Sequence, residues 1–139
     1  MSGKTTFTII KPYAVEHGFT GSILARINEA GFRISAMKYT QMSQKQAAQF
    51  YEIHKCKPFF KSLVSFMSSG PVVVAILEKE NAVEDYRILI GATDPSKAEK
   101  GTIRQLFGQS IQQNAVHGSD TDKNAQKEAS FFFAAIERF

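Results

Sequence analysis

Four segments of the chain carry the β-branched and aromatic residues that are typical of strands. The first, Thr5–Ile10, ends where Pro12 removes a backbone donor. Residues 32–41 form the second segment. Residues 72–77 are a continuous apolar run, which is the pattern of a central strand buried on both faces. A short strand is predicted at 116–117, so the pattern indicates one sheet.

Helical patterns separate these strands. The first helix is predicted from Thr20 or Gly21 to Ala30, because its apolar residues share one face and Gly31 is a natural C-cap. Ser43 is the predicted N-cap of a second helix. Further helices are expected at 59–67, at 81–90 and from about 122 to 132. A polar loop at 91–102 is long enough to suggest a function.

The order of these elements predicts the fold class. Strands alternate with helices along the chain, and some of the helical pieces are paired. Helices that join separated strands favour an α+β sandwich of the ferredoxin-like type (βαββαβ). We therefore expect a four-stranded antiparallel sheet with the helices on one face.

Composition agrees with a globular protein. The 139 residues predict one domain, residues 1–139, and 43% hydrophobic against 22% charged residues exclude disorder. The net charge of +4 is uneven: residues 1–57 hold eight Lys/Arg and three Asp/Glu, whereas residues 58–139 hold nine and ten. A basic half favours anionic partners such as nucleotides, nucleic acid or acidic lipid, although a solvated surface is the better explanation of the charge alone.

Cysteine usage and hydropathy indicate the compartment. The single cysteine, Cys56, excludes an intrachain disulfide and fits a reducing environment. We interpret it as structural. The longest apolar run is too short to span a bilayer, and the chain begins without an apolar signal region. A cytoplasmic protein with no membrane partner is therefore expected.

Several catalytic motifs are missing from the sequence. There is no G-x-x-x-x-G-K-[ST] loop, none of the protein-kinase elements, and no G-x-S-x-G elbow. The histidines His17, His54 and His117 lie far apart without ligands at metal spacing, so no protein-bound metal site is expected. Any phosphate chemistry must then use single side chains.

The segment from Asn114 to Asp120 carries the strongest signal for chemistry. An isolated histidine on a strand is usually a hydrogen-bonded structural residue. Around His117, however, Gly118 is expected to leave one side of the ring open to a bulky reactant. A nucleophilic imidazole nitrogen needs the other nitrogen's proton held by an acceptor, and Glu128 is the candidate.

The N-x-x-H-G-S-D signature at residues 114–120 resembles the nucleoside diphosphate kinase family. The resemblance covers essentially all 139 residues. Five further motifs follow in the order and spacing of that family: Thr8-Ile9-Ile10-Lys11-Pro12, Lys57-Pro58-Phe59-Phe60, Ser69-Gly70-Pro71-Val72, Gly91-Ala92-Thr93-Asp94-Pro95 and Gly101-Thr102-Ile103-Arg104. Agreement of separated motifs at this length is highly specific.

The resemblance implies a set of catalytic residues. His117 would take the terminal phosphate of a nucleoside triphosphate, mainly ATP, and pass it to a diphosphate in a ping-pong cycle. Glu128 would hold the ring through its other nitrogen, with Ser119 in the same hydrogen-bonded chain. Lys11 and Tyr51 would contact the phosphoryl group in transfer.

The resemblance also implies a nucleotide-binding set. Arg87, Thr93 and Arg104 would bind the remaining phosphates, and Asn114 would hold the sugar hydroxyl together with Lys11. Phe59 would stack on the base, with Leu63 and Ile111 around it, which tolerates any base. Mg²⁺ would arrive with the nucleotide and contact the protein mostly through water.

Each of these residues also has a structural explanation. Charged members such as Lys11, Arg87 and Arg104 are commonly solvated, and Glu128 is an ordinary exposed helix residue. Phe59 and Tyr51 fit core or helix packing, and Ser119 fits a helix cap. The motif spacing favours the functional interpretation for all of them.

The chain departs from the family's pattern at a few positions. Tyr13 stands where Asp is usual, Lys100 where Pro is frequent, and Gln105 and Leu106 where Gly-Asp is common. None of these positions carries a predicted phosphate contact. Activity is therefore expected to persist.

Two other functions compete with the kinase. A ferredoxin-like nucleic-acid-binding domain would need basic and aromatic residues interleaved on a strand, and 32–35 does not fit. A silent homologue would be expected to lose His117 or a phosphate contact. The resemblance further implies a homo-oligomer, either a tetramer or a hexamer.

Overall fold

The computed structural model describes residues 3–139, in which strands and helices alternate as predicted. The strands are β1 (Thr5–Ile10), β2 (Arg33–Thr40), β3 (Val72–Glu78) and β4 (Val116–Gly118). The longer helices are α2 (Thr20–Glu29), α3 (Gln44–Phe50), α4 (Phe60–Met67), α5 (Ala82–Ile90) and α7 (Asp122–Phe132). Shorter helical pieces are α1 (Pro12–Glu16), α6 (Ile103–Phe107), η1 (Glu52–His54), η2 (Pro95–Lys97) and η3 (Ala135–Glu137).

The strands form one antiparallel sheet in the order β2-β3-β1-β4. The central strand β3 is buried from Val72 to Leu77, as its continuous apolar run predicts. The short strand β4 pairs with β1, so that Ile9 lies opposite His117. This α+β arrangement confirms the predicted ferredoxin-like fold.

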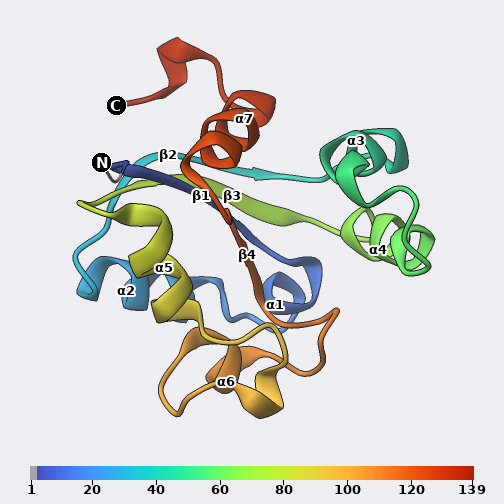
Figure 1. Cartoon of the computed structure of the whole chain (residues 1–139), viewed down its shortest axis with the longest axis horizontal. Helices are drawn as coiled ribbons and strands as arrows, with labels where there is room; N and C mark the ends of the chain where they lie inside the picture. Colours follow the sequence, from blue (N-terminus) through green and yellow to red (C-terminus); the bar gives the residue numbers. More distant parts are fainter. Residues whose placement is uncertain (1–2) are drawn as a thin grey trace.

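Helices cover both faces of the sheet, so the expected one-sided arrangement was incomplete (Figure 1). On one face α2 and α5 pack with α1 and α6, and on the other α7 packs with the α3–α4 hairpin. The alternation along β3 explains this, because Val73, Ala75 and Leu77 face the first set while Val72, Val74 and Ile76 face the second. A strand that is apolar at every position needs cover on both sides.

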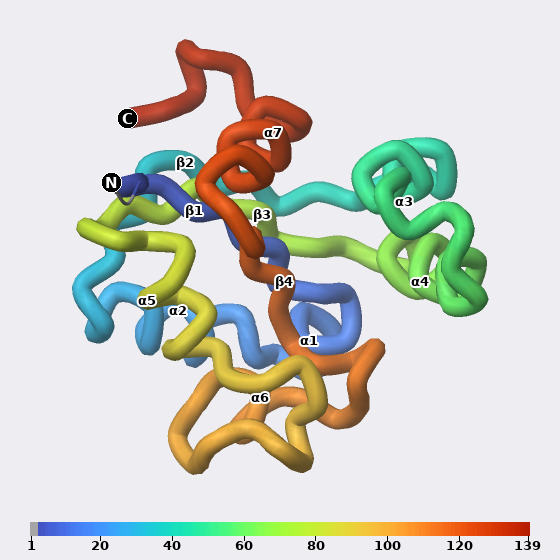
Figure 2. Tube along the Cα trace, viewed as in Figure 1, coloured from blue at the N-terminus to red at the C-terminus, as the bar shows by residue number. Residues whose placement is uncertain are grey.

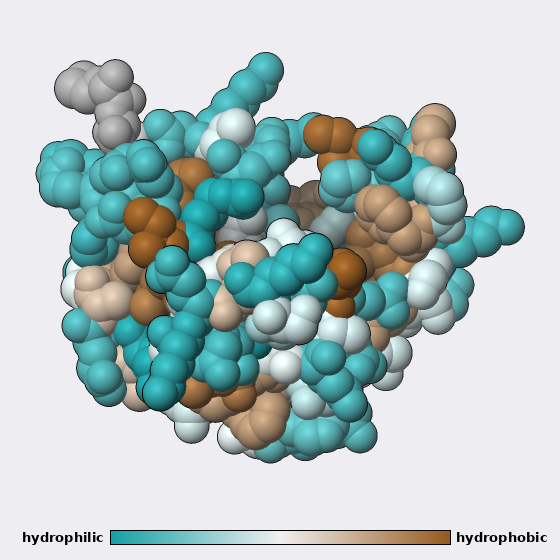
Figure 3. All heavy atoms as spheres, turned by 60° about the horizontal axis from the view of Figure 1, so that its bottom comes forward, coloured by the Kyte–Doolittle hydropathy of each residue, from teal (hydrophilic) through white to brown (hydrophobic). Residues whose placement is uncertain are grey.

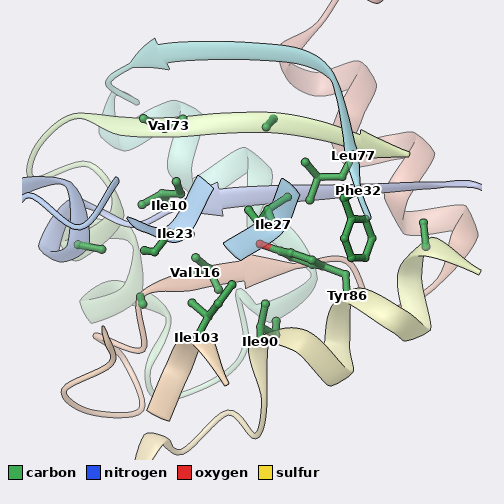
Figure 4. Close-up of a cluster of buried hydrophobic side chains, with 14 residues drawn as sticks. Ile10, Ile23, Ile27, Phe32, Val73, Leu77, Tyr86, Ile90, Ile103 and Val116 are labelled. Carbon is green, nitrogen blue, oxygen red and sulfur yellow. The ribbon is translucent and has the colours of Figure 1, made fainter. Parts of the chain in front are cut away.

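The core beneath α2 and α5 is dense and largely aliphatic. Figure 4 shows Ile23 and Ile27 of α2 and Ile90 of α5 among the side chains of the sheet. Tyr86 reaches from α5 into the same cluster and is fully buried. Its hydroxyl lies 2.6 Å from Thr8 Oγ1, which in turn donates to the carbonyl oxygen of His117 at 2.8 Å.

The α3–α4 hairpin extends beyond the ends of β2 and β3 (Figure 2). Ser43 begins it with the predicted N-cap, and Gln46 completes a capping box with bonds of 3.1 and 2.9 Å. Ala47, Tyr51 and Met67 anchor the hairpin in the core under α7. The hairpin thereby forms one wall of a cleft that lies at the end of the sheet.

Two short helices were not predicted by the hydrophobic pattern. Pro12 ends β1 as expected, but it also occupies the first turn of α1, where its missing N–H has no intrahelical partner to lose. Helix α6 begins after Thr102, whose side chain accepts the N–H of Gln105. Each helix has five residues, too few to show a helical period. No helix within residues 3–139 has the length and apolarity to cross a membrane.

Gly118 has a packing role that was not expected from the sequence. A Cβ at this position would lie 3.1 Å from Ile90 Cδ1 and from Tyr86 Cδ2. The missing side chain therefore lets α5 approach β4 from the face opposite to the His117 ring. The residue provides close packing beneath the strand, and it also lines the cleft beside His117.

Replacing Gly118 by alanine should therefore destabilise the fold. The added methyl has to displace Tyr86 or Ile90, and overpacking of this kind costs about 1–3 kcal/mol. Gly21→Ala is the matched control, because nothing lies within 4 Å of its Cβ position and alanine favours helix α2. Urea unfolding of both variants measures the difference, and equal stability of Gly118→Ala and the wild type would contradict this packing role.

Candidate active site

His117 lies at the middle of β4 with its ring on the α7 side of the sheet. Its Nε2 is 2.8 Å from Glu128 Oε1, and the two side chains are 20% and 17% exposed. Ser119 donates to the same carboxylate oxygen at 2.8 Å and accepts the N–H of Phe7 at 3.3 Å. Because a carboxylate accepts, the proton of the imidazole belongs on Nε2, and Nδ1 keeps a free lone pair.

Helix α7 places Glu128 beside this ring. Thr121 caps the helix by accepting the N–H of Asn124 at 3.0 Å, so the cap considered for Ser119 is supplied two residues later. Ala125 and Ala129 are fully buried one turn apart and bring the helix close to the sheet. Glu128, next to Ala129, is thereby directed toward β4 and is not an exposed helix residue.

The chain makes a strained turn just before β4. Ala115 has φ of +79°, and the N–H of Val116 bonds back to Asn114 O at 3.0 Å, which closes a γ-turn. A non-glycine residue in this region costs on the order of 1–3 kcal/mol. The turn lets Ala115 O accept the N–H of Lys11 at 2.9 Å, so the strain is offset by pairing between β1 and β4.

Lys11 follows directly after β1 and is 7% exposed. Its Nζ donates to Asn114 Oδ1 at 2.7 Å and to Gln112 O at 3.4 Å. Asn114 in turn donates to Thr93 O at 2.9 Å, which connects the lysine to the 91–102 loop. Burial, with a contribution from the charge of Arg104, lowers the pKa of Lys11 to about 7.

Arg104 lies close enough to the amine of Lys11 for its charge to affect the pKa of that amine. Its guanidinium donates to Gly91 O at 3.1 Å and to Val116 O at 3.0 Å, while Nε is buried without a partner. Burial is the main cause that lowers the pKa of Arg104 to about 10. Two cations held in a half-buried cleft favour an anionic ligand.

Tyr51 is the C-cap of α3, and its ring lies 6.1 Å from that of His117 and nearly perpendicular to it. The side chain is packed as a helix-face residue, but its hydroxyl is buried without a hydrogen-bond partner. Burial raises its pKa, and the nearby Glu128 raises it further. The hydroxyl therefore stays protonated and is available as a donor to a ligand.

These residues line a cleft of about 570 Å³ between the α3–α4 hairpin and the ends of β1, β4 and α7. In the space-filling view the surface is hollowed above and to the right of its centre (Figure 3). The cleft brings together the predicted residues Lys11, Tyr51, Phe59, Leu63, Arg87, Thr93, Arg104, Ile111, Asn114, His117 and Glu128. Ser119 lies behind them, fully buried and bonded to Glu128.

The two ends of the cleft differ in polarity. The end at His117 is rich in charged and hydroxyl groups, as described above. At the other end Phe59 and Ile111 are 48% and 60% exposed, so neither is a core residue. Exposed apolar side chains at a cleft mouth suit the flat face of an aromatic ligand.

Sequence reasoning missed several residues that also line the cleft. They are Phe50, Ile53, His54, Gln112, Asp120 and Asn124. Asp120 belongs to the signature segment, which already pointed to this part of the chain. Phe50 and Ile53 carried no such signal, because apolar residues on a helix are ordinarily assigned to the core.

Comparisons with known proteins agree on one family. The family model described as "Nucleoside diphosphate kinase" matches residues 4–138. The chain belongs to the nucleoside diphosphate kinase family. It is 55% identical to the nucleoside diphosphate kinase of Flavobacterium psychrophilum over 139 residues, covering 100% of both chains. It is 57% identical to that of Nitratiruptor sp. over 132 residues, covering 95% and 96%.

Solved structures show the same relationship. The Aquifex aeolicus nucleoside diphosphate kinase superposes with a TM-score of 0.96 at 43% identity, over 98% of this chain and 99% of that one. A halophilic nucleoside diphosphate kinase from Halobacterium salinarum, solved in complex with CDP, gives a TM-score of 0.94 at 36% identity over 98% and 91%. The predicted membership is thus confirmed.

The residues that depart from the family pattern do not line the cleft. Tyr13 packs against His17 with ring centroids 4.2 Å apart and the planes tilted by 37°, and both rings lie near Phe19. Gln105 accepts the N–H of Gly101 at 3.0 Å and so braces the turn before α6. Leu106 is 42% exposed on that helix. Local packing changes at these positions, while the charged end of the cleft is untouched.

Binding of a nucleoside diphosphate should take up a proton at Lys11. Its pKa of about 7 leaves the amine mostly neutral in the free protein at about pH 8.5, and a phosphate anion beside it raises that pKa again. At about pH 6 the amine is already protonated, so the uptake should nearly vanish. Calorimetric titrations in buffers of different ionisation enthalpy measure the proton count. Uptake that is independent of pH, or that persists in Lys11→Met, would count against this.

Proposed function

We propose that this protein transfers the terminal phosphate of a nucleoside triphosphate, mainly ATP, to a nucleoside diphosphate through His117. The enzyme is a phosphotransferase of the family established above. The observation that carries the residue assignment is the His117–Glu128 bond, which leaves Nδ1 free at the charged end of the cleft.

The first half-reaction begins with attack of His117 Nδ1 on the terminal phosphorus. The bond from phosphorus to the bridging oxygen breaks, and its electron pair leaves with the nucleoside diphosphate. Nε2 keeps its proton, so the phosphorylated ring is cationic. The carboxylate of Glu128, 2.8 Å from Nε2, compensates that charge, and Ser119 fixes the carboxylate in place.

Charge in the transferred group needs donors and cations around it. Lys11 and the hydroxyl of Tyr51 contact the phosphoryl group during its transfer, because both are buried at the His117 end of the cleft. Arg87, Thr93 and Arg104 bind the remaining phosphates. The second half-reaction reverses the first with a new nucleoside diphosphate as acceptor.

The base and sugar occupy the rest of the cleft. Phe59 stacks on the base with Leu63 and Ile111 beside it, and the exposed ring of Phe59 and the apolar lining around it support this placement. Stacking contacts do not read base edges, so the enzyme accepts many nucleotides. Asn114 and Lys11 hold the sugar hydroxyl.

Mg²⁺ is proposed to enter with the nucleotide. Among residues 3–139 no group of three or more His, Cys, Asp and Glu side chains could hold a metal by itself. The cleft fits an ion whose other ligands are phosphate oxygens and waters, and Asp120 is the carboxylate that could contact such a water. When bound, Mg²⁺ neutralises phosphate charge.

We also propose a homo-oligomer, either a tetramer or a hexamer, built from the domain at residues 1–139, of which residues 1 and 2 lie outside the described part. Strand β2 is an edge of the sheet, and Met37 and Tyr39 on it are 51% and 69% exposed.

The exposed thiol of Cys56 and the nucleotide substrates support a reducing, cytoplasmic location.

Light scattering after size-exclusion chromatography should give the mass of four or six copies of the 15.5 kDa chain. Tyr39→Lys places a charge on the exposed edge and should lower that mass, whereas Lys97→Ala, on the 91–102 loop, should not. A monomeric wild-type protein would refute the oligomer.

Incubation with γ-labelled ATP and magnesium tests the phosphohistidine. The wild type should take up acid-labile, base-stable label that a nucleoside diphosphate discharges, and His117→Ala should take up none. Label on His117→Ala would refute the proposed carrier. An unlabelled wild type would favour a silent homologue.

Replacing Glu128 by glutamine should slow both half-reactions by roughly 100-fold, since a neutral amide cannot compensate the cationic ring. Lys127→Gln is the matched control, because it changes one charge at the neighbouring, exposed position of α7. Rapid-quench measurement of label transfer gives the rates. Equal rates for Glu128→Gln and Lys127→Gln would exclude the carboxylate from the mechanism.

A further inference from the structure

The charged end of the cleft has one apolar wall that phosphate binding does not explain. Phe50, the last residue of α3, lines the cleft beside His117. Its ring lies 5.5 Å from the imidazole at an interplanar angle of 77°. Neighbouring groups at this end, such as Lys11 and Glu128, are polar or charged, whereas a phenyl ring offers nothing to a phosphate.

Phe50 is held in place by other rings. Its edge-to-face contacts include Tyr51 at 4.9 Å and 76°, and Phe131 at 5.4 Å and 79°. Phe7 and Phe132 lie at 5.9 and 5.5 Å. A ring with this many neighbours has little freedom to turn, so the wall beside His117 is fixed before any substrate binds.

The chemistry of the intermediate gives such a wall a purpose. A phosphorylated His117 whose Nε2 remains protonated is a reactive phosphoryl donor. Water attack on phosphorus would break the P–Nδ1 bond, return its electron pair to Nδ1, and release inorganic phosphate with the water's proton passing to solvent. Such a step wastes the phosphate, and apolar groups next to a reactive intermediate reduce it by excluding water.

We propose that Phe50 is a positioning residue that protects the phosphorylated His117 from hydrolysis and so directs the phosphate to the nucleotide. The ring occupies space on the cleft side of the imidazole that water would otherwise fill. It also restrains rotation of the imidazole about its Cβ–Cγ bond, which keeps Nε2 directed at Glu128. This inference rests on the proposed role of His117 as phosphate carrier.

The test measures the lifetime of the intermediate without an acceptor. The full-length protein is labelled with γ-labelled ATP and freed of nucleotide, and loss of label as inorganic phosphate is followed. Phe50→Ser should lose label roughly ten-fold faster than the wild type, equivalent to about 1.4 kcal/mol of barrier. Phe50→Met, which keeps apolar bulk, should restore most of the protection.

Phe131→Ser is the matched control. Phe131 packs on Phe50 and is 40% exposed, and no ring contact within residues 3–139 joins it to His117. Its variant should lose label at close to the wild-type rate. If Phe50→Ser keeps the wild-type lifetime, or if both serine variants accelerate hydrolysis equally, the proposal is overturned.

Two further outcomes separate this proposal from the carrier assignment. A wild type that takes up no label refutes the carrier, and the role of Phe50 with it. A labelled wild type with unchanged hydrolysis in Phe50→Ser refutes the role of Phe50 alone. If Phe50→Ser fails to fold, as thermal unfolding will show, Phe50→Ala replaces it, because alanine removes the ring and favours helix α3, and hydrolysis faster than in the wild type is again required.

Discussion

The pairing of β4 with β1 is the constraint on which the site depends. β4 has only three residues, and its register is fixed where Lys11 N–H reaches Ala115 O and Ser119 N–H reaches Phe7 O. Those two bonds place Lys11 at the end of the strand next to that of His117, although the two residues are far apart in the sequence. A shift of one residue would turn the imidazole to the opposite face of the sheet.

The two faces of the sheet hold different parts of His117. On the α7 side, side chains set the chemistry: Glu128 and Ser119 orient the ring. On the α5 side, the fully buried Tyr86 and Thr8 hold the His117 carbonyl through a hydrogen-bonded chain. Thr8 donates its single proton to that carbonyl, so Tyr86 must be the donor to Thr8. The nucleophile is thus fixed through its ring and through its backbone.

Much of the fold could be predicted from the sequence, for identifiable reasons. Thr5–Ile10 and Asp122–Phe132 have the predicted bounds, because a β-branched run and a capped helix are local signals. The short helix beginning at Pro12 was missed, since five residues show no period. The second helical layer was missed because local pattern does not say on which side of a sheet a helix packs.

The site residues could be predicted from family motifs more readily than from the properties of each residue alone. The order and spacing of motifs shared with a known family identified Lys11, Arg104 and His117, none of which carries a distinctive local signal. The strained turn at Ala115 has no local signal, because alanine seldom adopts positive φ. The surroundings of Phe50 depend on rings from three other elements, β1, β4 and α7. Contacts of this kind exist only after the chain has folded.

The close contact at Gly118 links catalysis to the composition of the core. Position 118 can carry a side chain only where the residues at 86 and 90 are small enough to receive it. Among relatives these three positions should therefore change together, although two of them never meet a substrate. Substitutions at positions 86 and 90 are limited because these residues pack against β4, the strand that carries His117. The residues allowed there therefore affect the rate of catalysis as well as the stability of the core.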